Sequence, residues 1–262
     1  MSRSVFALAL LLARILSASP KVLAVDVNGV VHPVTVEIVS RAIHQAQQSN
    51  ADAILLRLNT PGGLMNAMRE TIEKIVASPI PVITYVTPSG GRAASAGFFL
   101  LEAGDVAAMA PATNTGAAHP VLMSGQMDPE MKQKVENDAA ASVRSLAQKR
   151  GRNSALAEKA VLESKSFTEK EALDNRLIEF IARDEQDLFK QLDGREIVRF
   201  DGRKQTLRLA GAEVTNYELN VRERIISAIA DPNIALILIV LGALGIYVEF
   251  SAPGSPASPA GW

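Results

Sequence analysis

Short apolar runs alternate with amphipathic segments over most of the chain. Residues 21–27 (KVLAVDV) form a compact run with β-branched side chains, which is typical of a buried strand. In the next segment, 34–48, apolar residues recur at helical spacing, which predicts a helix with one buried face. The alternation continues with expected strands at 51–60, 81–88 and 105–111 and expected helices at 64–77 and 94–102. This order predicts an α/β domain with a mainly parallel sheet covered by helices.

The second half of the chain adds helices and then changes character. A long helix is expected over 129–149, and another begins at Thr168, whose capping-box partner is Glu171. A further strand is expected at 177–182. Residues 197–214 then predict two strands joined by an Asp-Gly turn, which is a hairpin signal.

Both ends of the chain are apolar. At the N-terminus, Arg3 precedes an apolar run over 5–12, which favours a secretory signal peptide or an uncleaved anchor. Near the C-terminus, an amphipathic helix over 221–229 leads to a charge-free stretch over 234–248. That stretch is short for a spanning helix, which needs about 20 apolar residues. A transmembrane segment is expected, and a hydrophobic association helix is the alternative.

These signals divide the chain into five parts. They are a signal peptide or N-terminal anchor (1–20), the α/β domain (21–195), a hairpin and short helix that connect to the membrane (196–230), a transmembrane segment (231–250) and a disordered tail (251–262) rich in Pro, Ser and Gly.

Composition excludes several kinds of function. The net charge of −1 gives no reason to expect nucleic acid as a partner. The chain has no cysteine, which excludes disulfides, thiol catalysis and cysteine metal sites. The histidines at 32, 44 and 119 are scattered and do not form a metal-ligand pattern, so neither a metal nor another cofactor is expected.

Candidate chemistry lies in loops that follow the expected strands, where ligand sites of open α/β sheets are found. Gly62 and Gly63 follow the second strand and precede a helix, so their N–H groups can point outward and stabilise a developing oxyanion. Ser95 follows the third strand among small residues, and the N–H of Ala96 is a further candidate donor. A plain turn and a helix-capping serine are the structural alternatives. The expectation of a site depends on both loops meeting at one edge of the sheet.

A nucleophilic serine needs a base, and the sequence leaves several candidates. His119 is one, and Lys132 and Lys134 on the long helix are the others. Each lysine has a carboxylate four residues on, Glu136 and Asp138 respectively, so two solvated ion pairs are the structural alternative. A lysine accepts a proton near neutral pH only in a dry pocket. The pattern of residues alone does not choose among the three.

Four segments carry a family resemblance: NTPGG, PSGGRAASAG, AMAPATNTGAAHPV and KVENDAAASVRSLAQKRGRN. They resemble, in order and over about 21–250, the NfeD family of membrane-bound serine proteases, which are Clp-protease-like. The resemblance implies a Clp protease/crotonase-like fold followed by a membrane segment. Long family members continue into further membrane helices and a small β-barrel of OB type, which the final SPASPAGW does not resemble.

The resemblance also implies roles for individual residues. Ser95 matches the nucleophile, and Lys134 matches the base because it precedes V-E-N-D-A, which Lys132 does not. Positions 62, 63 and 96 match the oxyanion donors. The implied partner is a stomatin- or flotillin-like membrane protein, cleaved in a hydrophobic segment, and a homodimer or larger assembly is expected. The expected location is the membrane, with the catalytic domain extracytoplasmic.

Lys134 is preferred to His119 as the base. His119 lies 24 residues after Ser95, a spacing similar to that of the Clp protease histidine. A histidine base normally needs an acid that orients it, and in Clp proteases that aspartate lies two residues before an aromatic residue. Here the residue two before Phe167 is Lys165, a cation that would oppose a protonated histidine. Two other functions remain open: a crotonase-type acyl-CoA enzyme, and a non-catalytic scaffold for a stomatin-like partner.

Overall fold

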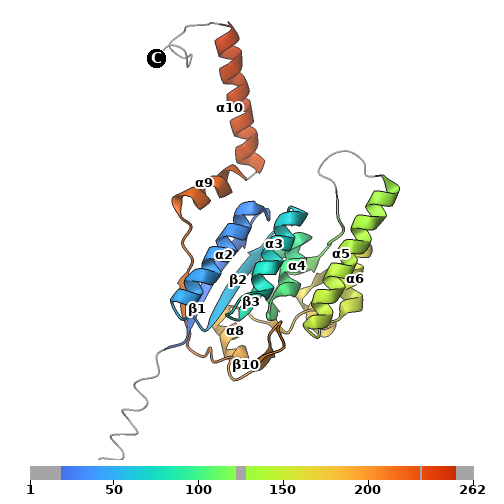
Figure 1. Ribbon diagram of the computed structural model, residues 1–262, viewed down its shortest axis with the longest axis vertical. Coiled ribbons are helices and arrows are strands. Elements are labelled where there is room, and N and C mark those ends of the chain that lie inside the picture. Colours follow the sequence, from blue (N-terminus) through green and yellow to red (C-terminus); the bar gives the residue numbers. More distant parts are fainter. Residues whose placement is uncertain (1–18, 122–127, 231, 252–262) are drawn as a thin grey trace, which may run out of the picture.

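A six-stranded sheet, parallel throughout, forms the centre of the molecule (Figure 1). The computed structural model describes residues 19–121, 128–230 and 232–251. In spatial order the strands are β11 (Glu213–Asn216), β1 (Lys21–Asn28), β2 (Ala53–Asn59), β3 (Val82–Val86), β5 (Val106–Met109) and β8 (Phe180–Ile181). The expected α/β class with a mainly parallel sheet is confirmed.

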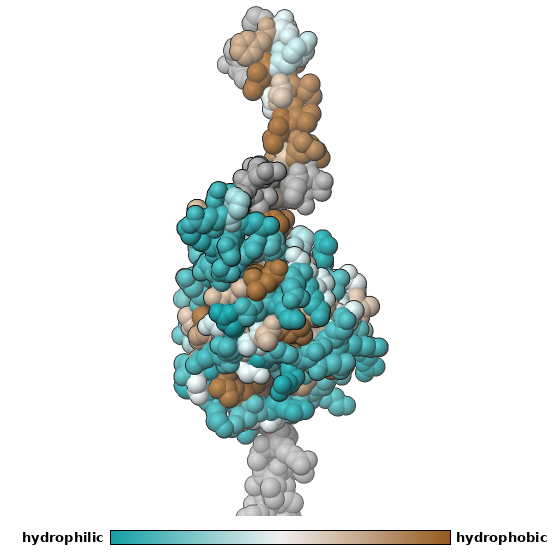
Figure 2. All heavy atoms as spheres, turned by 90° about the vertical axis from the view of Figure 1, so that its right-hand side faces the viewer, coloured by the Kyte–Doolittle hydropathy of each residue, from teal (hydrophilic) through white to brown (hydrophobic). Residues whose placement is uncertain are grey.

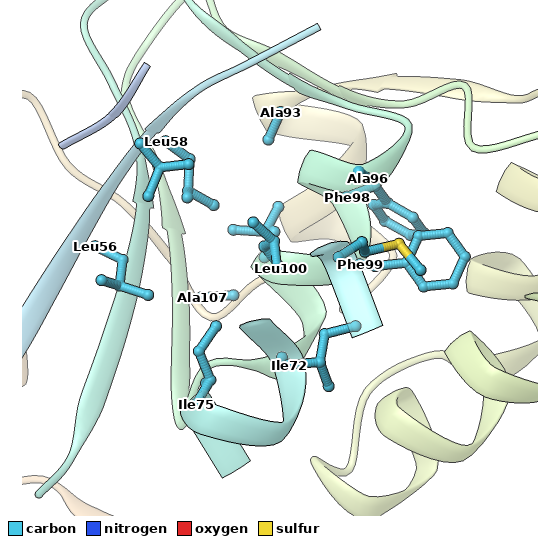
Figure 3. Packing of buried hydrophobic residues seen from close by; sticks show 14 of the residues in the cluster. Leu56, Leu58, Ile72, Ile75, Ala93, Ala96, Phe98, Phe99, Leu100 and Ala107 are labelled. Atoms are coloured by element: carbon cyan, nitrogen blue, oxygen red, sulfur yellow. The ribbon is translucent and has the colours of Figure 1, made fainter. Parts of the chain in front are cut away.

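Alternate residues of the strands enter two separate cores, because successive side chains of a strand point to opposite faces of the sheet. On one face, Leu56 and Leu58 pack under helices α2 (Pro33–Gln48), α3 (Met65–Val76) and α4 (Ala96–Ala103). On the other face, the strand residues pack against α8 (Glu185–Leu192) and the segment that follows it. Figure 3 shows part of the first of these cores, to which Leu56, Leu58, Ile72, Ile75 and Phe99 all belong.

Helices α5 (Pro129–Lys149), α6 (Ser154–Leu162) and α7 (Glu169–Asp174) complete the domain. The long helix has the bounds expected from the sequence, and Thr168 and Glu171 form the expected capping box at the start of α7. Packing of α5 on the core begins at Ala139, and its preceding turns extend beyond the body of the domain (Figure 1).

A small second sheet gathers the loops that carry the candidate chemistry. Its strands, β4 (Arg92–Ala94), β6 (Asn114–Gly116) and β7 (Ser166–Thr168), have only three residues each. This sheet was not predicted from the sequence, since three residues are too few to show a period of two. The end of β2 joins it: Thr60 N–H donates to the carbonyl of Arg92 (2.7 Å), and Ala94 N–H donates to the carbonyl of Thr60 (3.0 Å).

The segment expected to connect the domain to the membrane is partly built into the domain. The expected hairpin is present as β9 (Glu196–Val198) and β10 (Lys204–Thr206). Strand β11, however, pairs in parallel with β1 at the edge of the main sheet. Helix α9 (Val221–Ile229) follows, and α10 (Pro232–Ser251) then projects away from the domain (Figure 1).

Among the described residues, one helix is long and apolar enough to cross a membrane. Its window, Ile234–Ser251, has a mean hydropathy of 2.3 and is not buried against the rest of the chain. Figure 2 shows this helix as an apolar rod above a largely hydrophilic domain.

Buried charges hold the end of α4 that lies away from Ser95. The carboxylate of Asp105 binds Arg150 at 2.7 Å and lies 3.1 Å from Nε of Arg199. Arg152 binds Glu179 at 2.7 Å and donates to the carbonyl of Glu102 at 2.8 Å. These arginines connect the turn after α4 to the α5–α6 loop and to the segment after β9.

The carboxyl group of Glu102 is the anomaly in this cluster. Both its oxygens are buried without a hydrogen-bond partner in the described chain, and the nearest cation, Arg152 Nη1, lies 3.6 Å away. Burial raises the pKa of Glu102 to about 8, although the Arg152 charge lowers it in part. Glu102 is therefore protonated in the folded state at neutral pH.

We expect Glu102→Gln to abolish a loss of stability that the wild type suffers as the pH rises. In the unfolded chain Glu102 ionises near its ordinary pKa, whereas in the folded chain it resists ionisation up to about pH 8. The raised pKa thus costs stability increasingly between about pH 5 and pH 8, and glutamine, which cannot ionise, has no such cost. Urea unfolding in detergent should give free energies of unfolding that are closer for the two proteins at pH 5 than at pH 8. The difference in favour of the variant should be at least about 1 kcal/mol larger at pH 8 than at pH 5. A difference that is independent of pH would show that Glu102 does not hold its proton in the fold.

Candidate functional site

Ser95 occupies a strained turn between β4 and α4. Its φ of +53° and ψ of −118° are uncommon for a residue with a side chain. Two backbone hydrogen bonds hold this conformation: Ser95 N–H donates to the carbonyl of Gly116 (2.9 Å), and Phe98 N–H donates to the carbonyl of Ser95 (3.0 Å). Its hydroxyl makes no hydrogen bond within the described chain and lines a cavity. A serine at a sharp strand-to-helix turn has the geometry of a nucleophile.

The loop after β2 meets this turn at glycine. Gly62 has a φ of +126°, and a Cβ atom there would lie 2.7 Å from Cβ of Ser95. At Gly63 an added Cβ would lie 2.1 Å from the carbonyl oxygen of Val31. Val31 N–H donates to the carbonyl of Gly62 at 2.8 Å, and this pairing fixes the path of the loop. The structure therefore brings the two loops together at one edge of the sheet, as the sequence analysis expected.

The three expected oxyanion donors are not equivalent. The N–H of Gly62 donates to Thr60 Oγ1 at 3.0 Å and is not available to a ligand. The N–H groups of Gly63 and Ala96 donate no hydrogen bond within the described residues, and both residues line the cavity beside Ser95. The geometry therefore favours Gly63 and Ala96 as the donor pair, with Gly62 required for the close approach to Ser95.

The cavity beside Ser95 is apolar. It has a volume of about 330 Å³, and most of its surface comes from aliphatic, aromatic and thioether side chains. Its other lining residues are Val30, Pro61, Leu64, Met65, Met68, Phe99, Ala118, Pro120, Val121 and Ala139. Val121 and Leu64 are also exposed, at 80 % and 41 %, so the apolar surface continues from the cavity to the outside.

His119 is held away from this cavity. Its Nδ1 lies 3.1 Å from the carbonyl oxygen of Val161, which fits an N–H donor, and its Nε2 lies 3.2 Å from Oε1 of Glu136. The neighbours Ala118 and Pro120 line the cavity, but His119 does not. Both ring nitrogens therefore face groups other than Ser95.

The structure does not bring Lys134 to Ser95. The side chain of Lys134 is 67 % exposed, and its Nζ binds Glu130 at 2.8 Å rather than the Asp138 considered in the sequence analysis. Asp138 pairs with Arg69 instead, whereas Lys132 does approach Glu136, at 3.6 Å. Neither lysine lines the cavity, although Ala139, farther along α5, does. The dry surroundings expected for Lys134 are absent in this arrangement of the helix.

The described part of the chain contains no candidate metal site. No group of three or more histidine or acidic side chains there is arranged to hold an ion.

We expect Gly62→Ala to slow the reaction of the Ser95 hydroxyl with an electrophilic probe strongly, because the new methyl group would collide with the serine side chain and strain a left-handed backbone position. The rate of labelling by a fluorophosphonate probe should fall by about a hundredfold, the usual scale for a disrupted oxyanion site. Gly151→Ala is the matched control, since that glycine also has a positive φ but open space around it. Equal labelling of both variants would contradict this geometry, and circular dichroism would show whether either variant is unfolded.

Solved structures with the same fold come from a stomatin-specific membrane protease of Pyrococcus horikoshii. A lysine-to-alanine mutant of its 1510-N region in complex with a substrate peptide superposes with a TM-score of 0.76 at 36 % identity, covering 82 % of this chain and 99 % of that one. The 1510-N membrane protease specific for a stomatin homologue superposes with a TM-score of 0.71 at 35 % identity, covering 82 % and 100 %. A serine-to-alanine mutant of 1510-N has also been solved.

Comparison of sequences finds similarity to the same group of proteins. The membrane-bound protease PH1510 of Pyrococcus horikoshii is 38 % identical over 232 residues, which are 87 % of this chain and 53 % of that protein, so the chain spans about half the length of this relative. The membrane protein NfeD1b of Bacillus subtilis is 39 % identical over 87 residues, which are 33 % of this chain and 19 % of that protein. Residues 21–194 match the family described as NfeD1b, N-terminal domain. The chain therefore belongs to the NfeD1b family.

Proposed function

We propose that this chain is a membrane-associated serine endopeptidase with Ser95 as its nucleophile. The observation that carries the proposal is the junction of Ser95 with two unused amides, those of Gly63 and Ala96, at the wall of an apolar cavity. Ser95 Oγ attacks the scissile carbonyl carbon, and the two amides stabilise the charge that develops on the carbonyl oxygen. The serine proton passes to a base and then to the leaving amine. Water hydrolyses the acyl-enzyme and restores Ser95.

The proposed base is Lys134, which the family motif selects. Support comes from a solved relative whose lysine was replaced by alanine in a complex with a substrate peptide. In the present arrangement Lys134 is solvated and paired with Glu130. Catalysis therefore requires the first turns of α5, which the core does not hold before Ala139, to shift toward the cavity. Removal from water and from Glu130 would then favour a neutral amine.

The proposed substrate is a hydrophobic segment of a stomatin- or flotillin-like membrane protein. The apolar cavity and its exposed extension at Leu64 and Val121 suit aliphatic side chains of a bound peptide. The solved relatives are described as specific for a stomatin homologue. A homodimer or larger assembly is also proposed, on the family resemblance.

A crotonase-type enzyme has less support from the site. The described residues that line the cavity include no aspartate or glutamate to move a proton for acyl-CoA chemistry. A non-catalytic scaffold for a stomatin-like partner is the second candidate, and the absence of hydrolysis by the wild-type protein would favour it.

We expect Lys134→Ala to lower kcat on a hydrophobic peptide by roughly a hundredfold or more, the scale of a lost general base. Lys132→Ala is the matched control, because it removes the same cation from the same exposed part of α5 and also breaks an ion pair. That variant and His119→Ala should both retain most of the activity. A large loss in His119→Ala with little change in Lys134→Ala would assign the base to the histidine. Loss of activity in Ser95→Ala tests the nucleophile.

We propose that the catalytic domain faces the extracytoplasmic side, with α10 as its anchor. The proposal is supported by the expected export signal, which lies outside the described residues, and by the apolar α10. Because the chain lacks cysteine, Lys190→Cys on the exposed surface of α8 would be its one thiol. A membrane-impermeant maleimide should label this variant in intact cells as fully as in lysed cells. Labelling only after lysis would reverse the topology.

A further inference from the structure

Helix α9 carries an apolar stripe that nothing in the described chain covers. Val221, Ile225 and Ile229 are 73 %, 54 % and 47 % exposed. They lie four residues apart, so they form one continuous row along the helix. Three large aliphatic side chains in a row on so short a helix mark a surface that has a partner.

The opposite face of α9 is fixed to the domain. The buried carboxylate of Glu223 accepts the one O–H of Tyr217, whose Oη lies 3.0 and 3.1 Å from its two oxygens, and it lies 3.5 Å from Nε of Arg41 on α2. Ile226 packs against the main core, and Arg222 pairs with Glu37 of α2. At 100° per residue, Glu223 lies about 160° around the helix from Ile225. The stripe therefore points directly away from the domain.

The stripe is continuous with the apolar surface of α10. Only Ala230 and residue 231 separate α9 from the start of α10, so Ile229 and Pro232 lie within roughly 11 Å of each other by chain length. Figure 1 shows α9 lying across the base of α10, on the side of the domain from which α10 projects. If α10 crosses a bilayer, the surface of that bilayer would thus lie next to α9, on the side that the stripe faces.

We propose that α9 lies in the bilayer interface, with Val221, Ile225 and Ile229 among the lipid acyl chains close to the headgroups. The inference rests on the membrane attachment through α10 proposed above. Arg224 flanks the stripe on one side, where its long cationic side chain can reach the headgroups. A lipid surface fits better than a second protein copy, because three side chains are far fewer than the 20–30 residues per partner of a standard protein interface.

An interfacial position of α9 also bears on the surroundings of the proposed site at Ser95. A second cavity lies between the end of β1 and α9, where Asn28, Leu219 and Ser227 contribute to its lining. It shares Val30 and Pro61 with the cavity beside Ser95. With α9 on the bilayer, the cavity beside Ser95 would adjoin a second cavity that is lined in part by this interfacial helix.

Single cysteines in this cysteine-free chain provide the test. Ile225→Cys, Arg224→Cys, Lys190→Cys and Leu241→Cys would each carry an NBD fluorophore in the full chain, reconstituted into phosphatidylcholine vesicles with or without doxyl-labelled lipids. Leu241 on α10 reports membrane insertion, and Lys190 on α8 reports the exposed surface of the domain. We expect shallow doxyl lipids to quench the label at Ile225 on the order of threefold more than the label at Lys190, with Arg224 in between.

The possible outcomes distinguish the interfacial position of α9 from the membrane anchor formed by α10. Quenching at Leu241 without quenching at Ile225 would overturn the inference and leave the membrane anchor standing. No quenching at either position would overturn the anchor and the interfacial helix together. A blue-shifted label at Ile225 that lipids do not quench would overturn the inference in favour of a protein partner. None of these readings depends on peptidase activity, so the proposed chemistry is tested separately.

Discussion

The close approach of two loops at the edge of the sheet is the constraint on which the site depends. Gly62 and Ser95 are so near that even a methyl group on the glycine would collide with the serine. The approach is enforced by backbone hydrogen bonds that join the end of β2 to β4, and by the pairing of Val31 with Gly63. Because α4 starts at the same turn, Ala96, which carries its first free amide, lines the same cavity as Gly63. The proposed nucleophile and the proposed oxyanion donors thus depend on one packing arrangement.

The two ends of α4 contrast in their chemistry. At its start lies a strained serine with free amides and an apolar cavity. At its end lie buried arginines and carboxylates that fix the helix to the turn before β5 and to the hairpin region. Ion pairs of this kind are expensive to desolvate, and they contribute little to stability compared with well-packed apolar residues. Here they tie the end of this eight-residue helix to distant segments, while backbone hydrogen bonds to Gly116 and Phe98 hold the strained conformation of Ser95 at its start.

Helix α5 and the C-terminal helices are the parts that the core holds least. The first turns of α5 are solvated on most sides, and they carry the lysine that the family motif selects as the base. Helix α9 is bonded to the domain through its Glu223 face, and the apolar window of α10 is not buried against the described part of the chain. A loosely held helix near the cavity fits the proposal that the site completes itself when substrate binds.

The sequence by itself determined the order of the longer strands of the main sheet and of most helices, because their apolar runs or helical spacing are long enough to detect. It did not predict α6 or α8, which are only nine and eight residues long. It also determined the loops of the site, since Gly62, Gly63 and Ser95 fall at the ends of neighbouring strands. The general base was not determined by the pattern of residues. Its assignment to Lys134 came from a family motif, and the structure leaves it a proposal.

Only the tertiary structure decided the rest. The small sheet β4–β6–β7 and the pairing of β11 with β1 join segments far apart in the chain, and strands of three or four residues show no readable period. The use of the Gly62 amide by Thr60, the engagement of His119 by Val161 and Glu136, and the outward direction of Lys134 depend on which groups meet in space. Residue spacing fixes the face of a helix on which a side chain lies, but not what that face meets. That is settled by packing among elements distant in sequence.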